Sequence, residues 1–137
     1  MLQQTQVNTV IPYYTSWLKR YKTIQDVANA DIDKLLKSWE GLGYYSRCKN
    51  FHDASRIVVE KYNGAIPDTY EEFILLPGVG SYTANAVLSI AYNKNLAAVD
   101  VNLKRVFCRM LGFKKYTKHN IKQIEKLAYR LTQFGQA

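Results

Sequence analysis

The stretch Leu76-Pro77-Gly78-Val79-Gly80 separates two helical patterns and decides the fold. Pro77 limits the first helix to residues 68–76, because the residue before a proline disfavours the helical conformation. The two glycines allow a sharp turn whose N–H groups no side chain obstructs. Those groups precede the positive end of a helix expected over residues 81–92, a combination that suits a phosphate. The same stretch also fits a plain tight turn between two helices, and the spacing alone leaves both interpretations open.

Asp100 stands downstream of the second helix, between the apolar residues Val99 and Val101. An aspartate at this place can cap the helix that the periodicity predicts over residues 102–111. It can also act as a partly desolvated carboxylate in a cleft, where a negative charge interacts more strongly than in water. The two roles are compatible, because a capping bond also fixes the direction of the carboxylate.

Helical periodicity extends over almost the whole chain, whereas alternating strand patterns are scarce. The predicted helices cover residues 5–21, 23–30, 31–39, 45–62, 68–76, 81–92, 102–111 and 120–134. There is no internal repeat and no low-complexity linker between these segments. The predicted fold class is therefore all-α, in a single helical domain over residues 1–137.

Local signals add detail to this outline. Thr23 and Asp31 supply N-caps for two short helices. Pro12 is expected to kink the first helix or to lie near a turn, because proline lacks the N–H group that a helix interior needs. Phe51 is predicted to face the core from the longer helix that follows. Residues 81–92 are apolar on most of their faces, so we expect them to form the most buried helix.

The chain has 19 Lys and Arg against 11 Asp and Glu, and the positive excess lies entirely in its last quarter. Residues 1–100 hold ten basic and ten acidic side chains, whereas residues 101–137 hold nine basic ones and only Glu125. Such an asymmetry is typical of a protein that meets an anionic partner on one side. A solvated basic helix that only maintains solubility fits the charge equally well.

The cysteine and histidine contents argue against a metal centre. Cys48 and Cys108 are too few for a disulfide framework or a structural zinc site, so we expect reduced thiols. His52 and His119 lie far apart in polar helical surroundings, which favours surface roles. No apolar run reaches the ~18 residues of a membrane span, and no signal peptide opens the chain. We therefore expect no metal and no membrane partner, and a location in the bacterial cytoplasm with the nucleoid or in a nucleus.

Three stretches of the sequence together carry a family resemblance. They are Met1-Leu2-Gln3-Gln4-Thr5-Gln6-Val7, Trp39-Glu40-Gly41-Leu42-Gly43-Tyr44-Tyr45-Ser46-Arg47 and Leu76-Pro77-Gly78-Val79-Gly80-Ser81-Tyr82-Thr83-Ala84. With Asp100 downstream, the chain is similar to the helix-hairpin-helix DNA glycosylases, and most of all to the endonuclease III-like adenine glycosylases of the MutY type. The resemblance runs to about residue 112 and implies a six-helix core domain. It also implies base excision repair, in which adenine mispaired with 8-oxoguanine or guanine is flipped out and its N-glycosidic bond hydrolysed.

The resemblance implies roles for single residues. Asp100 would stabilise the sugar cation that forms as the glycosidic bond breaks, or attack it transiently, and Tyr82 and Asn102 would orient this carboxylate and the flipped nucleotide. Leu2 and Val7 would line the adenine pocket. The implied DNA contacts are Gln3, Gln4, Thr5, Leu42, Tyr44, Gly78, Val79, Gly80, Ser81, Lys104 and Arg105. We expect the partner to be double-stranded DNA with a mispair, bound by a monomer.

Four of these DNA contacts, Gln4, Thr5, Leu42 and Tyr44, would meet the oxidised guanine and wedge into the base stack. The glycine turn would bind a backbone phosphate, and Lys104 and Arg105 in the basic last quarter are expected to lie along the duplex backbone.

The chain also departs from the family pattern. Tyr82 stands where relatives with lyase activity have a lysine, which implies a glycosylase without a Schiff-base strand-cleavage step. Asn85 and Val101 stand where adenine glycosylases usually have glycine, and these changes point toward mismatch thymine glycosylases and endonuclease III.

The resemblance places the family's general acid, a glutamate, just before Met1, and its four cluster cysteines and its 8-oxoguanine-sensing domain beyond Ala137. We therefore expect no iron–sulfur cluster in these residues, since Cys48 and Cys108 do not have the required spacing. Three functions stay open: an adenine glycosylase, a catalytically dead DNA-binding module of the same fold, and a mismatch glycosylase acting on thymine or uracil.

Overall fold

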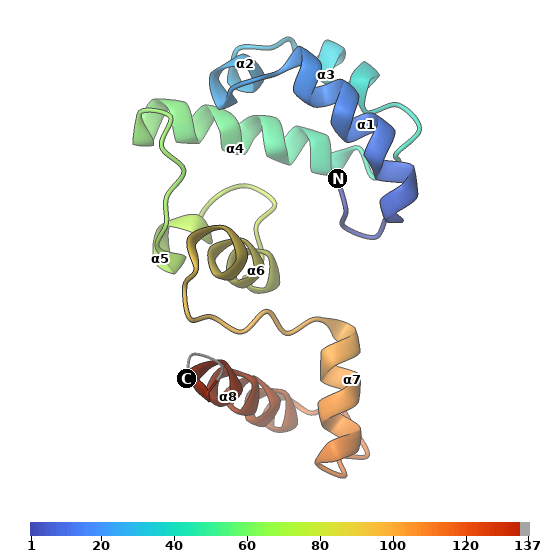
Figure 1. The fold of residues 1–137 in the computed structure, drawn as a ribbon, viewed down its shortest axis with the longest axis vertical. Coiled ribbons are helices and arrows are strands. Elements are labelled where there is room, and N and C mark those ends of the chain that lie inside the picture. The colour runs from blue at the N-terminus through green and yellow to red at the C-terminus, as the bar shows by residue number, and fades with distance from the viewer. Residues whose placement is uncertain (135–137) are drawn as a thin grey trace. The chain divides into compact units, whose positions relative to one another are not determined.

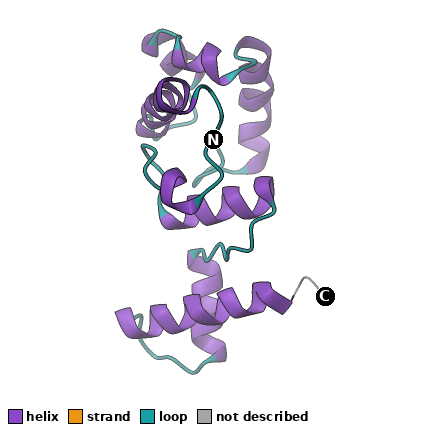
Figure 2. Cartoon of the chain, turned by 90° about the vertical axis from the view of Figure 1, so that its left-hand side faces the viewer, coloured by secondary structure: helices purple, strands orange, loops and turns teal. Residues whose placement is uncertain are grey.

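A computed structural model describes residues 1–134, and every regular element among them is a helix (Figure 2). The all-α fold class predicted from the sequence is therefore confirmed. The helices are α1 (Val7–Arg20), α2 (Ile24–Ala28), α3 (Ile32–Ser38), α4 (Ser46–Tyr62), α5 (Tyr70–Phe73), α6 (Ser81–Tyr92), α7 (Val101–Met110) and α8 (Lys118–Phe134). Within the described residues, none of these helices is long and apolar enough to cross a membrane.

The described chain forms two compact units. The first comprises Met1–Pro67 with Leu75–Gly78 and contains α1 to α4, drawn from blue to green in Figure 1. The second comprises Asp68–Ile74 with the chain from Val79 onward and contains α5 to α8, drawn from yellow-green to red. The predicted DNA contacts are divided between these units, so each group is described in its own surroundings.

Aromatic side chains form the core of the first unit. The Trp17 ring meets Trp39 edge-on, with the ring centroids 5.7 Å apart, and lies 4.8 Å from Tyr21. The same core also contains the buried side chains of Val10, Val27, Leu35, Leu42 and Cys48. Burial of such large rings is the main stabilising contribution in a small domain.

The two predicted N-caps of this unit are confirmed. The Thr23 hydroxyl accepts from the N–H of Asp26, and the Asp26 carboxylate accepts from the N–H of Thr23, each forming half of a capping box. The hydrogen bonds from Thr23 hold the pKa of Asp26 below its usual value. Asp31 accepts from the N–H groups of Asp33 and Lys34 at the start of α3. Local signals of this kind need no tertiary context, which is why the sequence reveals them.

The Cys48 thiol is completely buried, and desolvation raises its pKa to about 11. Because the thiolate is the reactive form, this pKa alone should slow alkylation of Cys48 at pH 8 by about 100-fold relative to an unfolded thiol. Labelling of a Cys108→Ala variant with a maleimide, with and without denaturant, isolates Cys48. Equal rates in the two conditions would contradict the burial of this thiol.

One hydrophobic core cluster of the second unit lies between α7 and α8. Phe107 and Cys108 of α7 pack against Ile124 and Ala128 of α8, and Val99 joins them from the segment before α7. The strongly amphipathic pattern of both helices explains this pairing, because each presents one apolar face. The basic side chains of α8 lie on the exposed part of that helix.

Three expectations of detail differ from the structure. α5 ends at Phe73, three residues before the limit set by Pro77, since a proline fixes only how far a helix can reach. Phe51 is 43% exposed, with its ring at the edge of the aromatic core, 6.1 Å from Trp17. In α6 Ala84 and Leu88 are fully buried, whereas Ile90 is 85% exposed. A helix that is apolar all round still buries only the faces that its neighbours cover.

Candidate nucleic-acid interface

The loop before α1 carries the first group of predicted DNA contacts, and all of it belongs to the first unit. Gln4 adopts a left-handed backbone conformation, with φ of 55°, and the Thr5 N–H donates to the carbonyl of Leu2. The Thr5 hydroxyl donates to the carbonyl of Gln3 at 3.3 Å. The left-handed conformation costs roughly 1–2 kcal/mol for a residue with a side chain, so neighbouring contacts must hold Gln4 in it.

The loop Trp39–Tyr45 carries the second group in the same unit. Gly41, Gly43 and Tyr44 all have positive φ, at 93°, 67° and 48°. Gly41 could not be replaced without displacing a neighbour, because a Cβ atom there would overlap the hydroxyl of Tyr13. Tyr44 follows this tight path and its side chain is 61% exposed. The loop therefore presents an aromatic ring to solvent from a backbone that glycines bend.

Arg47, in the first turn of α4, joins these two loops. Its Nη1 donates to the carbonyl of Met1 at 2.8 Å and also to that of Gln3. Its Nη2 donates to the carbonyls of Leu42, at 3.3 Å, and Gly43, at 3.2 Å. Nothing in the sequence predicts this role, although Arg47 ends one of the three quoted stretches. Its partners are main-chain carbonyls, which no residue pattern marks.

The side chains predicted to meet the bases differ in their exposure. Leu2 and Val7, predicted to line the adenine pocket, are both exposed. Leu42, predicted as a DNA contact, is only 6% exposed and packs in the core with Trp17 and Trp39. In this conformation Leu42 supports the loop from beneath and offers almost no surface to a ligand.

The two glycines of the predicted turn differ in their backbone conformation and in the space around their Cα atoms. Gly78 has φ of 75°, and a Cβ atom on it would lie 2.7 Å from both Cβ and Nδ2 of Asn50 in the same unit. Gly80 has an extended backbone, and a Cβ atom there would meet nothing within 4 Å. Gly78 is therefore required by the fold, whereas Gly80 leaves open space at the start of α6.

Gly80 is the N-cap of α6, and as a glycine it has no side chain that could cap the backbone N–H groups of that end. Ser81 and Tyr82 follow in the first turn and are exposed. Uncapped N–H groups and the positive end of the helix dipole are the features that bind a phosphate. The phosphate contact at this end of α6 stays a prediction, and Val79, which precedes Gly80, is partly buried.

Asp100 is the N-cap of α7, in the second unit. Its Oδ1 accepts from the N–H of Leu103 at 2.7 Å, and its Oδ2 accepts from the Asn102 amide at 3.3 Å. The capping role is thus present, and the bond from Asn102 fixes the second oxygen as well. A partly buried carboxylate held at both oxygens has a defined direction, as its predicted chemical role requires.

The two departures from the family pattern have local explanations. Asn85 on α6 donates from its amide to the carbonyl of Ala97 at 2.9 Å, so it anchors the extended segment that leads to Asp100. Val101 begins α7 with an ordinary backbone and an exposed side chain. Neither position requires glycine here.

Lys104 and Arg105 lie in α7 beyond this cap, Lys104 partly buried and Arg105 exposed. Arg109 is exposed in the last turn of the same helix. A basic helix directly after a capping carboxylate has the charge that a phosphate backbone attracts. The assignment of these residues as DNA contacts stays a prediction.

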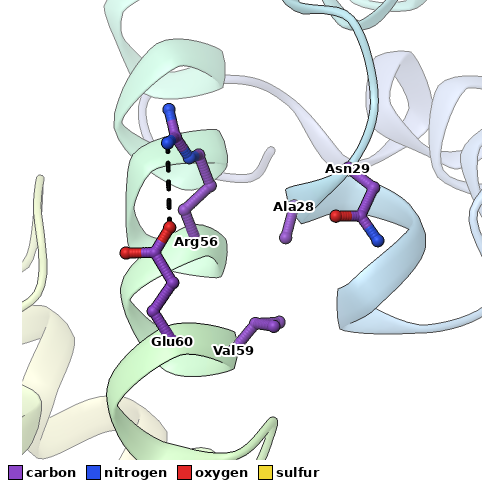
Figure 3. Close-up of a pocket in the computed structure, with 5 residues that line it drawn as sticks. All are labelled: Ala28, Asn29, Arg56, Val59 and Glu60. Carbon is purple, nitrogen blue, oxygen red and sulfur yellow. Dashed lines mark ion pairs between the residues drawn. The ribbon is translucent and has the colours of Figure 1, made fainter.

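A surface hollow of about 290 Å³ lies elsewhere in the first unit, between the end of α2 and α4 (Figure 3). It is lined by Ala28, Asn29, Arg56, Val59 and Glu60, and Arg56 forms an exposed ion pair with Glu60 at 3.7 Å. None of the predicted site residues lines this hollow. An exposed pair of this kind contributes little to stability.

The described residues do not fit an iron–sulfur cluster. Cys48 and Cys108 are buried in different units, and two thiolates are too few for a cluster with four cysteine ligands. Within residues 1–134, no group of three or more His, Cys, Asp or Glu side chains is placed to hold a metal ion.

The chain was compared with models of known protein families and with known proteins. A model of the HhH-GPD superfamily of base excision DNA repair proteins matches residues 1–130. The chain belongs to this superfamily. Among relatives, this HhH-GPD chain is 50% identical over 111 residues to the adenine DNA glycosylases of Rattus norvegicus and Homo sapiens. It is 43% identical over 130 residues to the adenine DNA glycosylase of Buchnera aphidicola subsp. Baizongia pistaciae.

Solved structures of the superfamily agree with the helical fold. A thermostable thymine-DNA glycosylase is 30% identical, with a TM-score of 0.85, over 95% of this chain and 61% of that one. A trapped covalent intermediate of endonuclease III with DNA is 28% identical, with a TM-score of 0.79, over 91% of this chain and 58% of the other. The match covers 95% of this chain and 36% of the Buchnera protein, and 80% of this chain against 22% and 20% of the rat and human proteins. The chain thus spans between about a fifth and about a third of the relatives' length.

Proposed function

We propose that this HhH-GPD chain binds duplex DNA that contains a mispaired adenine and hydrolyses the N-glycosidic bond of that adenine. The observation that carries the proposal is the Asp100 carboxylate, held by the Leu103 N–H and the Asn102 amide at the start of α7. Support for adenine as the base comes from relatives 43–50% identical that are adenine DNA glycosylases. The expected partner bases are 8-oxoguanine and guanine.

The chemistry follows from charge. As the bond between adenine and the sugar breaks, the electron pair leaves with adenine and the sugar acquires positive charge. A carboxylate of fixed direction stabilises that cation more in the transition state than in the ground state, which lowers the barrier. Water then adds to the sugar carbon, and the departing base takes up a proton. Tyr82 supports hydrolysis without strand cleavage, because a tyrosine cannot form the Schiff base that a lysine forms.

The test incubates the chain, in excess, with duplexes that contain A:8-oxoguanine, A:G, T:G or U:G, and then cleaves abasic sites with alkali. We expect cleavage of the adenine strand, at least about tenfold faster than release of thymine or uracil, because the pocket must match the edge of one base. Release of thymine but not adenine would overturn the assignment of the base. Binding without release of any base would identify a DNA-binding module instead.

A further inference from the structure

A single guanidinium group holds the peptides that lead into Gln4 and Tyr44. The carbonyl of Gln3 belongs to the peptide before Gln4, and the carbonyl of Gly43 belongs to the peptide before Tyr44. Arg47 donates to the first from Nη1 and to the second from Nη2. Because the two nitrogens are parts of one rigid planar group, these two peptides are fixed relative to each other.

The residues that follow those peptides are conformationally unusual. Among the described residues, four other than glycine have positive φ, and two of them, Asn63 and Asn93, end α4 and α6 as C-caps. Helix ends commonly use this conformation. Gln4 and Tyr44 have no such explanation, and both follow a carbonyl held by Arg47. The guanidinium group therefore maintains the two left-handed residues of the loops.

The Arg47 guanidinium group also contacts the ring of Tyr44. The guanidinium carbon lies 5.3 Å from the centre of the Tyr44 ring and 5.6 Å from that of Trp39. The Trp39 indole donates from Nε1 to the carbonyl of Gly43 at 3.2 Å, which adds a second bond to the same peptide. Tyr44 remains 61% exposed despite these contacts, so part of its ring is available to a base.

We propose that Arg47 is a positioning residue that sets Gln4 and Tyr44 as a pair and so determines the preference for mispaired over matched duplex. This inference rests on the proposed function, because it assigns these side chains to the mispair. Arg47 does not touch the DNA in this proposal. It acts through the backbone of both loops, and a lysine cannot replace it, since one ammonium group lacks the fork that reaches two peptides.

The first experiment compares Arg47→Lys with a matched control, Arg56→Lys, which lies on the same helix α4 in an exposed ion pair with Glu60. Kd is measured for an A:8-oxoguanine duplex and for a fully matched duplex, and thermal unfolding is followed in parallel. We expect Arg47→Lys to lower the ratio of the two affinities by at least about tenfold, while Kd for the matched duplex changes less than about threefold. Arg56→Lys should alter neither value.

The second experiment is a double-mutant cycle with Tyr44→Ala. If Arg47 acts through Tyr44, Arg47→Lys should change the mispair preference at least about fivefold less in the Tyr44→Ala background than in the wild-type background. Fluorescence of 2-aminopurine beside the mispair supplies an independent readout, since it rises when a side chain opens the stack. Wild-type protein and Arg56→Lys should raise it, and Arg47→Lys should bind with a smaller rise.

The outcomes separate the two proposals. Equal loss of affinity for both duplexes in Arg47→Lys, or an undiminished effect in the Tyr44→Ala background, would show that Arg47 is only structural. A wild-type chain that does not prefer the mispaired duplex would overturn the proposed function and this inference with it. A wild-type preference that Arg47→Lys retains would overturn the role of Arg47 alone.

Discussion

Replacement of Asp100 by asparagine is expected to slow adenine release at least about 100-fold, while Kd for the mispaired duplex stays within about twofold. Asparagine is as good an N-cap as aspartate, so the bond from the Leu103 N–H should persist and α7 should remain intact. What the variant loses is the negative charge that opposes the developing sugar cation. Single-turnover cleavage and equilibrium binding on the same A:8-oxoguanine duplex measure the two quantities.

Two further substitutions at this position separate the cap from the chemistry. Asp100→Ser retains a capping oxygen without a charge, and it should behave like Asp100→Asn in both assays. Asp100→Ala removes the cap as well, and it should also lower the free energy of unfolding by about 1 kcal/mol. If Asp100→Asn and Asp100→Ser release adenine at the wild-type rate, Asp100 is a helix cap and nothing more.

The second large effect is expected at Gly78. Gly78→Ser would force a side chain into a left-handed backbone and against Asn50, so we expect a loss of at least about 2 kcal/mol in the free energy of unfolding. A loss of that size lowers Tm by about 8 °C in a chain of this length. Thermal and denaturant unfolding measure it directly.

Gly80→Ser is the matched control, because it makes the same substitution at the other glycine of the stretch. A Cβ atom at Gly80 meets nothing, and serine is a favourable N-cap for α6, so stability should be unchanged or slightly higher. The new hydroxyl would occupy the N–H groups at the helix start, so we expect weaker binding to matched and mispaired duplex alike. Similar Tm values for the two serine variants would contradict the distinction between the glycines.

The helix caps and the fold class could be predicted because they depend on short-range chemistry. Thr23, Asp31 and Asp100 each stand at the start of an apolar periodic segment, and each forms its capping bond. The helices over residues 46–62 and 81–92 begin and end within a residue of their predicted limits. The glycine turn was found for the same reason, since a proline and two glycines interrupt two periodic segments.

The remaining features depend on neighbours that the sequence does not show. The family resemblance implies that Leu42 contacts DNA. In the structure its side chain lies in the core, in a loop where Gly41 and Gly43 both have positive φ. The role of Arg47 could not be predicted, because its partners are main-chain carbonyls, and those of Met1 and Gln3 belong to residues 46 and 44 positions away in the sequence. Asn85 departs from the family pattern in the sequence, and only the structure shows that its amide anchors the chain before Asp100.

The burial of both cysteines has a consequence for the conditions under which the protein can work. The proposed partner base, 8-oxoguanine, forms where peroxides and radicals are abundant, and such oxidants convert accessible thiolates to sulfenic acids. Cys48 lies at 0% exposure with a raised pKa, and Cys108 is buried among the side chains between α7 and α8. The fold thus withholds its thiols from the same oxidants that create the proposed partner base, and purified protein should retain DNA binding in peroxide without added reductant.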